Sequence, residues 1–355
     1  MRRLQKEGLV TLKELFIDGT KIEANANRYT FVWRGSINYH LAGLLDSIDQ
    51  LFEKYNSFLQ ENDYGTKYEL GNAQMFVIEG MDKVREATFM RMKEDHMLNG
   101  QLKPAYNVQI AVENYFIVHG YVSSDRTDYN TLIPVLEKHK NAFGRILEEV
   151  TADSGYCSEK NLLYLKQNEI SSYIKLQDHE KRKTRAYSED ISKYYNMRTG
   201  IFEDEQFYIC HDGRELRHLR TETKERDGYT QIFEVYGCAD CSGCEHKARC
   251  LYKYDAEKDA EKNKVMKINE QWEELKERSH ANIQSERGIL KRQTRSIQTE
   301  GHFGDIKENE NFRRFNYRSS DKVYKEFMLY AIGRNINKYH RFLYEKLRKF
   351  EGKTA

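Results

Sequence analysis

The stretch YNVQIAVENYFIVHGYV, residues 106–122, predicts the centre of a β-sheet. Its two halves, 106–112 and 115–122, are rich in β-branched and aromatic side chains, which favour extended strands. Glu113 and Asn114 stand between them, and a two-residue connection between two such segments is typical of a tight hairpin. We therefore expect two adjacent antiparallel strands joined by a turn at these two residues.

Strand and helix patterns alternate around this hairpin. Upstream, residues 14–18 form a short apolar run that ends in an acid, as a buried strand does. Downstream, residues 128–141 predict a helix that Pro134 interrupts, and residues 146–152 predict another strand. Residues 158–168 then predict a helix that begins with a serine cap. The core pattern is therefore three strands, a helix, a strand and a helix.

Two longer segments interrupt this core. Residues 36–102 are polar, with apolar residues at helical spacing, and predict a helical insertion. Residues 171–265 mix short β-like pieces with charge runs and four closely spaced cysteines, and predict a β-rich insertion. After it, helix is expected through 265–295, 297–310 and 321–349. Without the insertions, the order β-β-β-α-β-α-α is the arrangement of a ribonuclease H-like domain.

The expected fold class is therefore α/β, with a ribonuclease H-like core, a helical insertion and a β-rich insertion that carries cysteines. At 355 residues, the chain is long enough for two modest domains or for one domain with a large insertion. Five regions follow: the first core strand in 1–20, the helical insertion in 21–105, the core in 106–170, the β-rich insertion with the cysteine cluster in 171–265, and the C-terminal helical part of the core, with Glu300, in 266–355.

The composition is that of a globular, strongly solvated chain. Hydrophobic residues make up 39% and charged residues 32%, and the net charge of +2 does not by itself indicate a nucleic-acid partner. Basic residues nevertheless cluster locally, in 180–185, 287–295, 313–318 and 334–349. No window approaches about 18 uninterrupted apolar residues, and the N-terminus lacks the apolar core of a signal peptide, so no membrane partner is expected. Six cysteines suit a reducing compartment, and a cytoplasmic location is expected.

Three acids stand at positions that this topology would bring together. Asp18 ends the first strand, Asp153 follows the fourth strand, and Glu300 lies on a late helix. Open α/β sheets bind ligands near such strand ends. Three converging carboxylates repel one another unless cations lie between them, and their hard oxygens select Mg²⁺ or Mn²⁺. Two such ions, roughly 3.5–4 Å apart, would clamp the attacking and leaving oxygens of a phosphodiester displacement.

Lys307 stands seven residues after Glu300, which places both on nearly the same face of a regular helix. The lysine is therefore expected to contact a phosphate near the metal ions as a point charge. An exposed ion pair is the structural alternative for this pair, and ordinary turns are the alternatives for Asp18-Gly19 and for Asp153 before Ser-Gly. The coincidence of all three acids favours the catalytic interpretation.

The segment CADCSGCEHKARC has the spacing C-x2-C-x2-C-x5-C, and cysteines two residues apart suit tetrahedral zinc. The preferred ligand set adds a cysteine from a neighbouring strand to three from this segment: Cys210, Cys241, Cys244 and Cys250. Cys238 in place of Cys210 is one alternative, His211 and His246 are further candidate ligands, and reduced cysteines without a metal are another alternative. A site of this kind would be structural, because protein ligands close it.

Four segments resemble bacterial insertion-sequence transposases of the DDE class: LFIDGTKIEANANRYTFVW, MRMKEDHMLNGQLKPAYNVQIAVENYFIVHG, TADSGYCSEKNLLYL and RSIQTEGHFGDIKENENFRRFNYR. More narrowly, they are similar to the branch with a large helical insertion after the first Asp and a cysteine-bearing insertion before the Glu. The likeness runs from about residue 5 to residue 345. It implies a ribonuclease H-like core, Mg²⁺-dependent nicking at element ends, and strand transfer into target DNA.

By position, the resemblance assigns the catalytic triad and a phosphate-contacting lysine to four residues: Asp18, Asp153, Glu300 and Lys307. Related transposases carry a Tyr and an Arg before the glutamate. Here Ser296 stands where that Arg would fall, and Arg295 is the candidate substitute. Members of this branch usually begin with a long helical domain, whereas this chain opens seventeen residues before Asp18. We therefore expect an N-terminally truncated copy or one reading frame of a split element.

The partner that the resemblance implies is DNA, both the terminal inverted repeats of the element and the target. Phosphate contacts are expected from arginines on both sides of Glu300: Arg292, Arg295, Arg313, Arg314 and Arg318. Joining two element ends implies self-association of the protein. Two other functions remain open, an inactive DNA-binding fragment of a transposase and a ribonuclease H-like nuclease without strand transfer.

Overall fold

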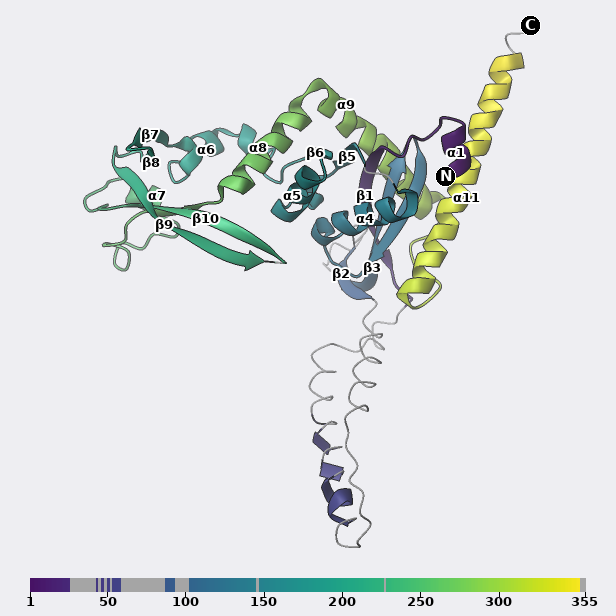
Figure 1. Ribbon diagram of the computed structural model, residues 1–355, viewed down its shortest axis with the longest axis horizontal. Helices are drawn as coiled ribbons and strands as arrows, with labels where there is room; N and C mark the ends of the chain where they lie inside the picture. Colours follow the sequence, from purple (N-terminus) through teal and green to yellow (C-terminus); the bar gives the residue numbers. More distant parts are fainter. Residues whose placement is uncertain are drawn as a thin grey trace. The chain divides into compact units, whose positions relative to one another are not determined.

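The computed structural model describes residues 1–25, 87–92, 102–144, 147–226 and 228–351, together with 43, 46–47, 50–51 and 53–58 (Figure 1). The fold is mixed α/β, and the chain divides into two compact units. Unit 1 comprises Met1–Val10, Asp18–Val135 and Gln298–Ala355. Unit 2 comprises Thr11–Ile17 and Leu136–Ile297. Both units therefore combine segments that are distant in sequence.

The sheet of unit 1 is built around a hairpin of β3 (Leu102–Glu113) and β4 (Phe116–Ser123), which pair antiparallel. β2 (Thr88–Arg91) pairs antiparallel with the first residues of β3. β1 (Glu14–Glu23) is the other neighbour of β3, and its residues from Asp18 onward belong to this unit. Every residue of β3 after the first two is buried, as expected for a central strand that is covered on both faces.

The predicted hairpin is confirmed, but its turn lies one residue further along the chain than expected. Glu113 pairs with Phe116 and ends β3, so Asn114 and Tyr115 form the two-residue turn. Their φ angles are 46° and 66°, and the favoured hairpin turn needs two left-handed residues. Asparagine tolerates this conformation well, and the Asn114 side chain also donates a hydrogen bond to the carbonyl oxygen of Leu9 at 2.9 Å.

The long helix α11 (Ser320–Glu351), predicted from its pattern, lies along β4 (Figure 1). Its Phe327 side chain is fully buried. Gly120 in β4 permits this contact, because a Cβ at that position would lie 2.7 Å from the Phe327 ring. The Asn335 side chain extends the packing by bonding both the N–H and the carbonyl oxygen of Ile117, at 2.9 and 2.8 Å. The helix is therefore tied to the strand by both apolar and polar contacts.

In unit 2, the first residues of β1 pair in parallel with β5 (Glu149–Ala152), which pairs in parallel with β6 (Ser171–Ile174). The register places Phe16 opposite Thr151. α5 (Glu159–Gln167) lies between β5 and β6 in the chain, and its predicted serine cap is confirmed, because the Ser158 hydroxyl accepts a hydrogen bond from the Asn161 N–H.

α8 (Glu270–Gln284) and α9 (Glu286–Arg295) pack against these strands within unit 2. The Ser279 hydroxyl donates a hydrogen bond to the carbonyl oxygen of Ile174 at 2.8 Å. The continuous helix expected from residue 265 to residue 295 is wrong in two respects. Its first four residues form β11 (Val265–Ile268), where burial alternates with a period of two, and the remainder breaks at Ser285, which caps α9.

A second sheet of unit 2 is entirely antiparallel, in the order β11-β10-β9-β8-β7. Its remaining strands are β7 (Arg198–Phe202), β8 (Glu205–Ile209), β9 (Glu215–Arg226) and β10 (Tyr229–Cys238). β9 is almost wholly exposed. The core of the sheet is correspondingly small: Tyr208, Leu216, Tyr236, Cys238, Met266 and Ile268.

Shorter helices complete the described chain: α1 (Arg2–Lys6), η1 (Asp128–Asn130), α4 (Leu132–Phe143), η2 (Ser154–Tyr156), η3 (Lys181–Lys183), α6 (Arg185–Ser188), η4 (Tyr194–Asn196), α7 (Lys247–Cys250), η5 (Ser296–Glu300), α10 (Gly301–Gly304) and η6 (Asp305–Asn309). Pro134 does not interrupt its helix, because it lies in the first turn of α4, where a missing N–H costs nothing.

The helical insertion expected in 21–105 falls largely outside the described residues, although 53–58 are helical and β2 is a strand. Among the described helices, none is long and apolar enough to span a bilayer.

Candidate functional site

Asp18 lies in β1, and its buried carboxylate has partners on two sides within unit 1. The backbone N–H of Gly19 donates to Oδ1 at 2.8 Å, and the hydroxyl of Thr299 donates to Oδ2 at 3.1 Å. Thr299 directly precedes Glu300, whose side chain is exposed. A hydrogen bond thus joins the acid of the first strand to the segment that carries the predicted glutamate.

A polar network lies beside Asp18 and was not predicted from the sequence. The Gln109 amide nitrogen donates to the Asp128 carboxylate at 2.9 Å and to the Asn107 side-chain oxygen at 2.9 Å. A Cβ added at Gly19 would lie 2.3 Å from this amide nitrogen, so only glycine fits here. No direct sequence signal marks this contact, because Gly19 directly follows the predicted strand 14–18 and belongs to a turn with Asp18 in the structural alternative.

Glu300 and Lys307 both lie in π-helical turns. Glu300 ends η5, Lys307 lies in η6, and the short helix α10 separates them. π-helical turns occur mainly as single-turn bulges and are frequent at functional sites. The regular spacing that predicted a shared helical face is wrong for this segment, because π-turns rotate less per residue than α-turns. The environments also differ, since Glu300 is exposed and Lys307 is buried.

His302, between these two turns, anchors the segment inside unit 1. Its Nε2–H donates to the carbonyl oxygen of Tyr115 at 3.0 Å, and its Nδ1 accepts a hydrogen bond from Arg334 of α11 at 3.2 Å. Arg334 also pairs with Asp305 and with Glu310. Burial and the Arg334 guanidinium lower the pKa of His302 to about 4, so the ring is neutral near pH 7. The segment of Glu300 and Lys307 is therefore held against both the hairpin turn and α11.

Asp153 belongs to unit 2, whereas Asp18 and Glu300 belong to unit 1. Asp153 directly follows β5 and caps η2, where its Oδ1 accepts the N–H of Gly155 at 2.7 Å. The turn that was the structural alternative for this residue is thus present.

α9 is fixed to β1 and β5 of unit 2 by a cluster of charges. The ammonium group of Lys291 pairs with Glu14 and with Glu149, the latter at 2.7 Å, and Arg287 also pairs with Glu149. Burial alone would raise the pKa of Glu149, but Lys291 and Arg287 hold it below its usual value. Since η5 directly follows α9, this cluster holds the helix that leads into the Glu300 segment.

The predicted DNA-contacting arginines have different environments. In unit 1, Arg313 pairs with Glu308 at 2.6 Å and donates to the Lys307 carbonyl oxygen, and Arg318 donates to the Asn25 carbonyl oxygen. Arg314 is exposed. The other two, Arg292 and Arg295, lie in α9 within unit 2 and are partly buried.

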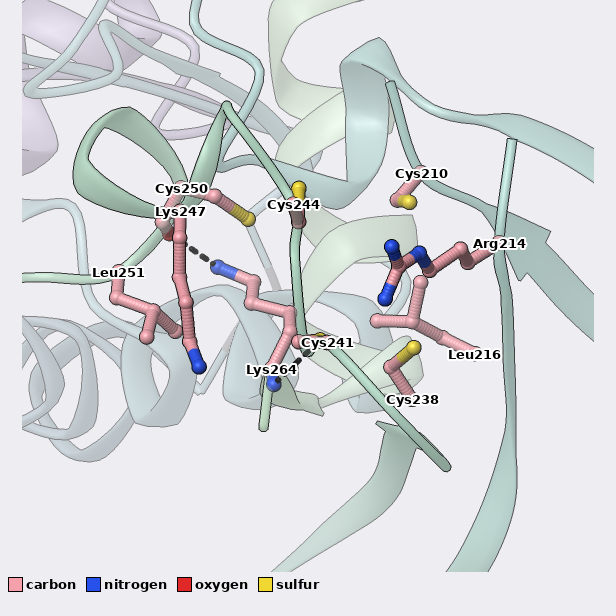
Figure 2. A pocket seen from close by; sticks show the side chains of 10 residues that line it. All are labelled: Cys210, Arg214, Leu216, Cys238, Cys241, Cys244, Lys247, Cys250, Leu251 and Lys264. Atoms are coloured by element: carbon pink, nitrogen blue, oxygen red, sulfur yellow. Dashed lines mark hydrogen bonds between the residues drawn. The ribbon is translucent and has the colours of Figure 1, made fainter. Parts of the chain in front are cut away.

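Five cysteines line one cavity of about 20 Å³ within unit 2, together with Arg214, Leu216, Lys247, Leu251 and Lys264 (Figure 2). All six cysteines of the chain are free of disulfide bonds. The cavity cysteines come from the β8–β9 turn, the end of β10, the loop that follows it and α7: Cys210, Cys238, Cys241, Cys244 and Cys250.

Burial and neighbouring thiols set the acidity of this cluster. They raise the pKa of Cys238 to about 11, chiefly through burial and a hydrogen bond with Cys241. Burial also raises the pKa of Cys250, and Cys210, Cys241 and Cys244 add to that effect. Cys157 lies apart from the cavity, and burial raises its pKa to about 12, as for a packed thiol.

Within the described part of the chain, no group of three or more His, Cys, Asp or Glu side chains is arranged around a common metal position. The donor chemistry nevertheless differs clearly between the two candidate sites. The predicted acids offer carboxylate oxygens, which suit Mg²⁺ or Mn²⁺, and the cysteine cavity offers thiols, which suit Zn²⁺.

A family model described as "Transposase DDE domain" matches residues 209–340. The match contains the cysteine cluster, Glu300 and Lys307, and it does not reach Asp18 or Asp153. No curated protein and no solved structure matches the chain. The family match supports a DDE transposase, an enzyme that acts on DNA, and divalent metals are general in that family.

Proposed function

We propose that this chain is the catalytic region of a DDE transposase that nicks DNA at insertion-sequence ends and transfers the ends into target DNA. The match to the transposase DDE domain supports the class of enzyme. The order of strands and helices in the described chain supports a ribonuclease H-like core, since an antiparallel hairpin, a helix, a parallel strand and a further helix follow β1.

Asp18, Asp153 and Glu300 are the proposed metal ligands. In unit 2, Phe16 of β1 pairs with Thr151 of β5 in parallel, and each acid stands two residues beyond its member of this pair. In unit 1, Thr299 bonds Asp18 and is followed by Glu300. The strand pairing within unit 2 and the hydrogen bond within unit 1 are the two observations that support the proposed triad. Mg²⁺ or Mn²⁺ bound there would activate the attacking oxygen and stabilise the leaving oxygen of a phosphodiester.

The residues around the acids have their own parts in this proposal. The Gly19 N–H and the Thr299 hydroxyl orient the two oxygens of Asp18 before any metal binds. The packing of His302 against Tyr115 and Arg334 holds the turns of Glu300 and Lys307 in place. Lys307 is proposed to contact the phosphate next to the scissile bond as a point charge.

DNA binding is proposed to rest on contacts between arginines and phosphates, which position the duplex without reading its sequence. The candidates are Arg292, Arg295, Arg313, Arg314 and Arg318. Arg314 is exposed, which favours such a role, whereas Arg313 must release Glu308 before it can contact a phosphate. Self-association on two element ends completes the proposal, because joining uses both ends.

The hydrogen bond from Thr299 to Asp18 is the observation that carries this proposal. The test is a joining assay with the full chain, supercoiled plasmid, Mn²⁺ and a duplex with a free 3′-hydroxyl, taken from the DNA that flanks the coding sequence. Joined products should fall by more than about 100-fold in Asp153→Asn and in Glu300→Gln, because even outer-shell changes at metal sites cost about 10–100-fold.

Glu308→Gln is the matched control, since Glu308 is an exposed carboxylate in the same helical segment and pairs with Arg313. This variant should retain joining. Equal joining by the wild type and by both acid variants would overturn the proposed triad. Nicked plasmid without joined products would instead identify a nuclease that hydrolyses DNA without strand transfer.

A further inference from the structure

We infer that Cys210, Cys241, Cys244 and Cys250 bind one structural Zn²⁺ in unit 2, and that Cys238 is a packed thiol outside the ligand set. This site is separate from the proposed active site. It lies at one end of the antiparallel sheet, where four thiols from two distant segments line the same small cavity (Figure 2). A cavity of about 20 Å³ has room for a single atom-sized occupant.

The four thiols come from two segments of the chain: the β8–β9 turn, and the loop after β10 together with α7. Cys210 begins the β8–β9 turn, where its N–H donates to the Arg214 carbonyl oxygen at 2.8 Å and its carbonyl oxygen accepts the Gly213 N–H at 3.0 Å. Cys241 and Cys244 are separated by two residues, the spacing that lets both thiolates face one ion. Cys250 ends α7, the short helix that follows.

Hydrogen bonds to sulfur separate Cys241 from Cys238. The Cys241 sulfur accepts the backbone N–H of Lys264 at 3.4 Å, a contact that a metal-bound thiolate can keep. The Cys238 thiol instead donates to the carbonyl oxygen of Asp240 at 3.2 Å, a contact that would be lost if this sulfur bound a metal. Cys238 also belongs to the small apolar core of the sheet. The ligand set with Cys210 therefore fits better than the alternative with Cys238.

Three cations line the same cavity, Arg214, Lys247 and Lys264, and their charge suits a thiolate site (Figure 2). Four thiolates around Zn²⁺ carry a net charge of about −2. Arg214 donates to the Asp240 carbonyl oxygen at 2.8 Å, and the Lys264 ammonium donates to the Cys250 carbonyl oxygen at 3.0 Å. Arg214 also forms an ion pair with Asp212 at 2.8 Å, whereas the ammonium groups of Lys247 and Lys264 donate to carbonyl oxygens, so these two lysines can offset the charge of the metal-bound cluster.

A bound zinc ion would stabilise this sheet, whose apolar core is small. Its core contains six buried side chains, and β9 is almost wholly exposed. The thiols line the cavity without meeting at one point, so binding needs rotation of their side chains toward the centre and release of four protons to solvent. The four ligands would then join the β8–β9 turn to the segment 241–250, and no coordination position would remain open for catalysis.

The test uses the full chain, purified under reducing conditions and then exposed to Zn²⁺ or to Co²⁺ as a spectroscopic probe. One Zn²⁺ per chain, with the visible absorption of tetrahedral Co²⁺–thiolate, is expected for the wild type. Each of the variants Cys210→Ser, Cys241→Ser, Cys244→Ser and Cys250→Ser should abolish stoichiometric binding. The matched controls Cys238→Ser and Cys157→Ser remove a thiol from the cavity and from elsewhere in the unit, and both should keep one ion per chain.

One further variant and one further readout distinguish loss of a metal ligand from unfolding. Cys244→His should retain one Co²⁺ with a shifted absorption band, because three thiolates and an imidazole also bind zinc. Amide exchange should show that removing the metal deprotects 205–268. A wild type that binds no metal, or loss of metal in Cys238→Ser but not in Cys210→Ser, would overturn the inference. These readouts do not depend on DNA joining, so the proposed function stands or falls separately.

Discussion

The hydroxyl of Thr299 donates a hydrogen bond to the carboxylate of Asp18 across 281 residues of sequence. Both groups are buried within unit 1. A hydrogen bond to a charged group contributes about 1.5–3 kcal/mol, and it also fixes the direction of the acceptor. The bond therefore both stabilises unit 1 and sets how the first-strand acid is presented next to Glu300.

Thr299→Val removes this donor while keeping the shape of the side chain. We expect the free energy of unfolding to fall by about 1.5–3 kcal/mol, because the buried carboxylate loses a partner. DNA joining should fall about 10–100-fold, as for other groups that orient a metal ligand. Urea unfolding and the joining assay check both values. Thr299→Ser is the control, since it retains a hydroxyl; equal losses in both variants would contradict a role for the hydrogen bond.

Gly19→Ala should be destabilising, because the new Cβ would lie 2.3 Å from the Gln109 amide nitrogen. Gln109 is fully buried and bonded to Asn107 and Asp128, so it cannot move away freely. Overpacking of this kind costs about 1–3 kcal/mol. A double-mutant cycle with Gln109→Ala tests the contact directly, since the smaller side chain makes room for the methyl group. Purely additive effects in the cycle would show that the two residues do not collide.

Sequence patterns predicted the elements that local chemistry determines. The β3–β4 hairpin, the Ser158 cap and the course of α11 each depend on residues that are close together in the chain. The errors lie where a few residues change the boundary or the type of an element. Glu113 continues its strand and moves the turn, and 265–268 alternate like a strand within a segment that otherwise reads as helix.

The candidate site was less accessible to sequence reasoning than the fold. The acids could be named from their positions at expected strand ends, but Thr299 and Gln109 act through contacts that no local pattern encodes. The π-turns of Glu300 and Lys307 were also missed, because a regular α-helical period was assumed. These features arise from tertiary packing, in particular from the anchoring of His302 between the hairpin and α11.

His302 should make stability depend on pH between its unfolded and folded pKa values. Its pKa falls from 6.5 to about 4 on folding, so the unfolded chain binds more protons in this window and stability falls as pH falls. Between pH 7 and pH 5 the loss from this residue should be about 2 kcal/mol. Urea unfolding at both pH values measures it. His302→Gln keeps a donor and an acceptor without titrating and should lack this part of the pH dependence; an unchanged loss in the variant would contradict the assignment.

Lys291→Met should destabilise unit 2 far more than the same change at an exposed ion pair. The Lys291 ammonium is largely buried between Glu14 and Glu149, and removing one partner from a buried ionic cluster costs about 3–5 kcal/mol. Lys13→Met is the matched control, because Lys13 pairs with Glu148 at 2.6 Å with both side chains more than half exposed. That change should cost no more than about 1 kcal/mol.

The same pair of variants also tests how Lys291 affects the pKa of Glu149. Loss of the Lys291 cation should raise the pKa of Glu149, because Arg287 then remains as its one cationic partner among the ion pairs of the described residues. Stability of the variant should consequently show a weaker decline on acidification through the range where Glu149 titrates. Chemical denaturation of both variants at pH 7 and pH 4 checks this. Similar costs for the two lysines at pH 7 would show that the buried cluster does not hold α9 on its strands.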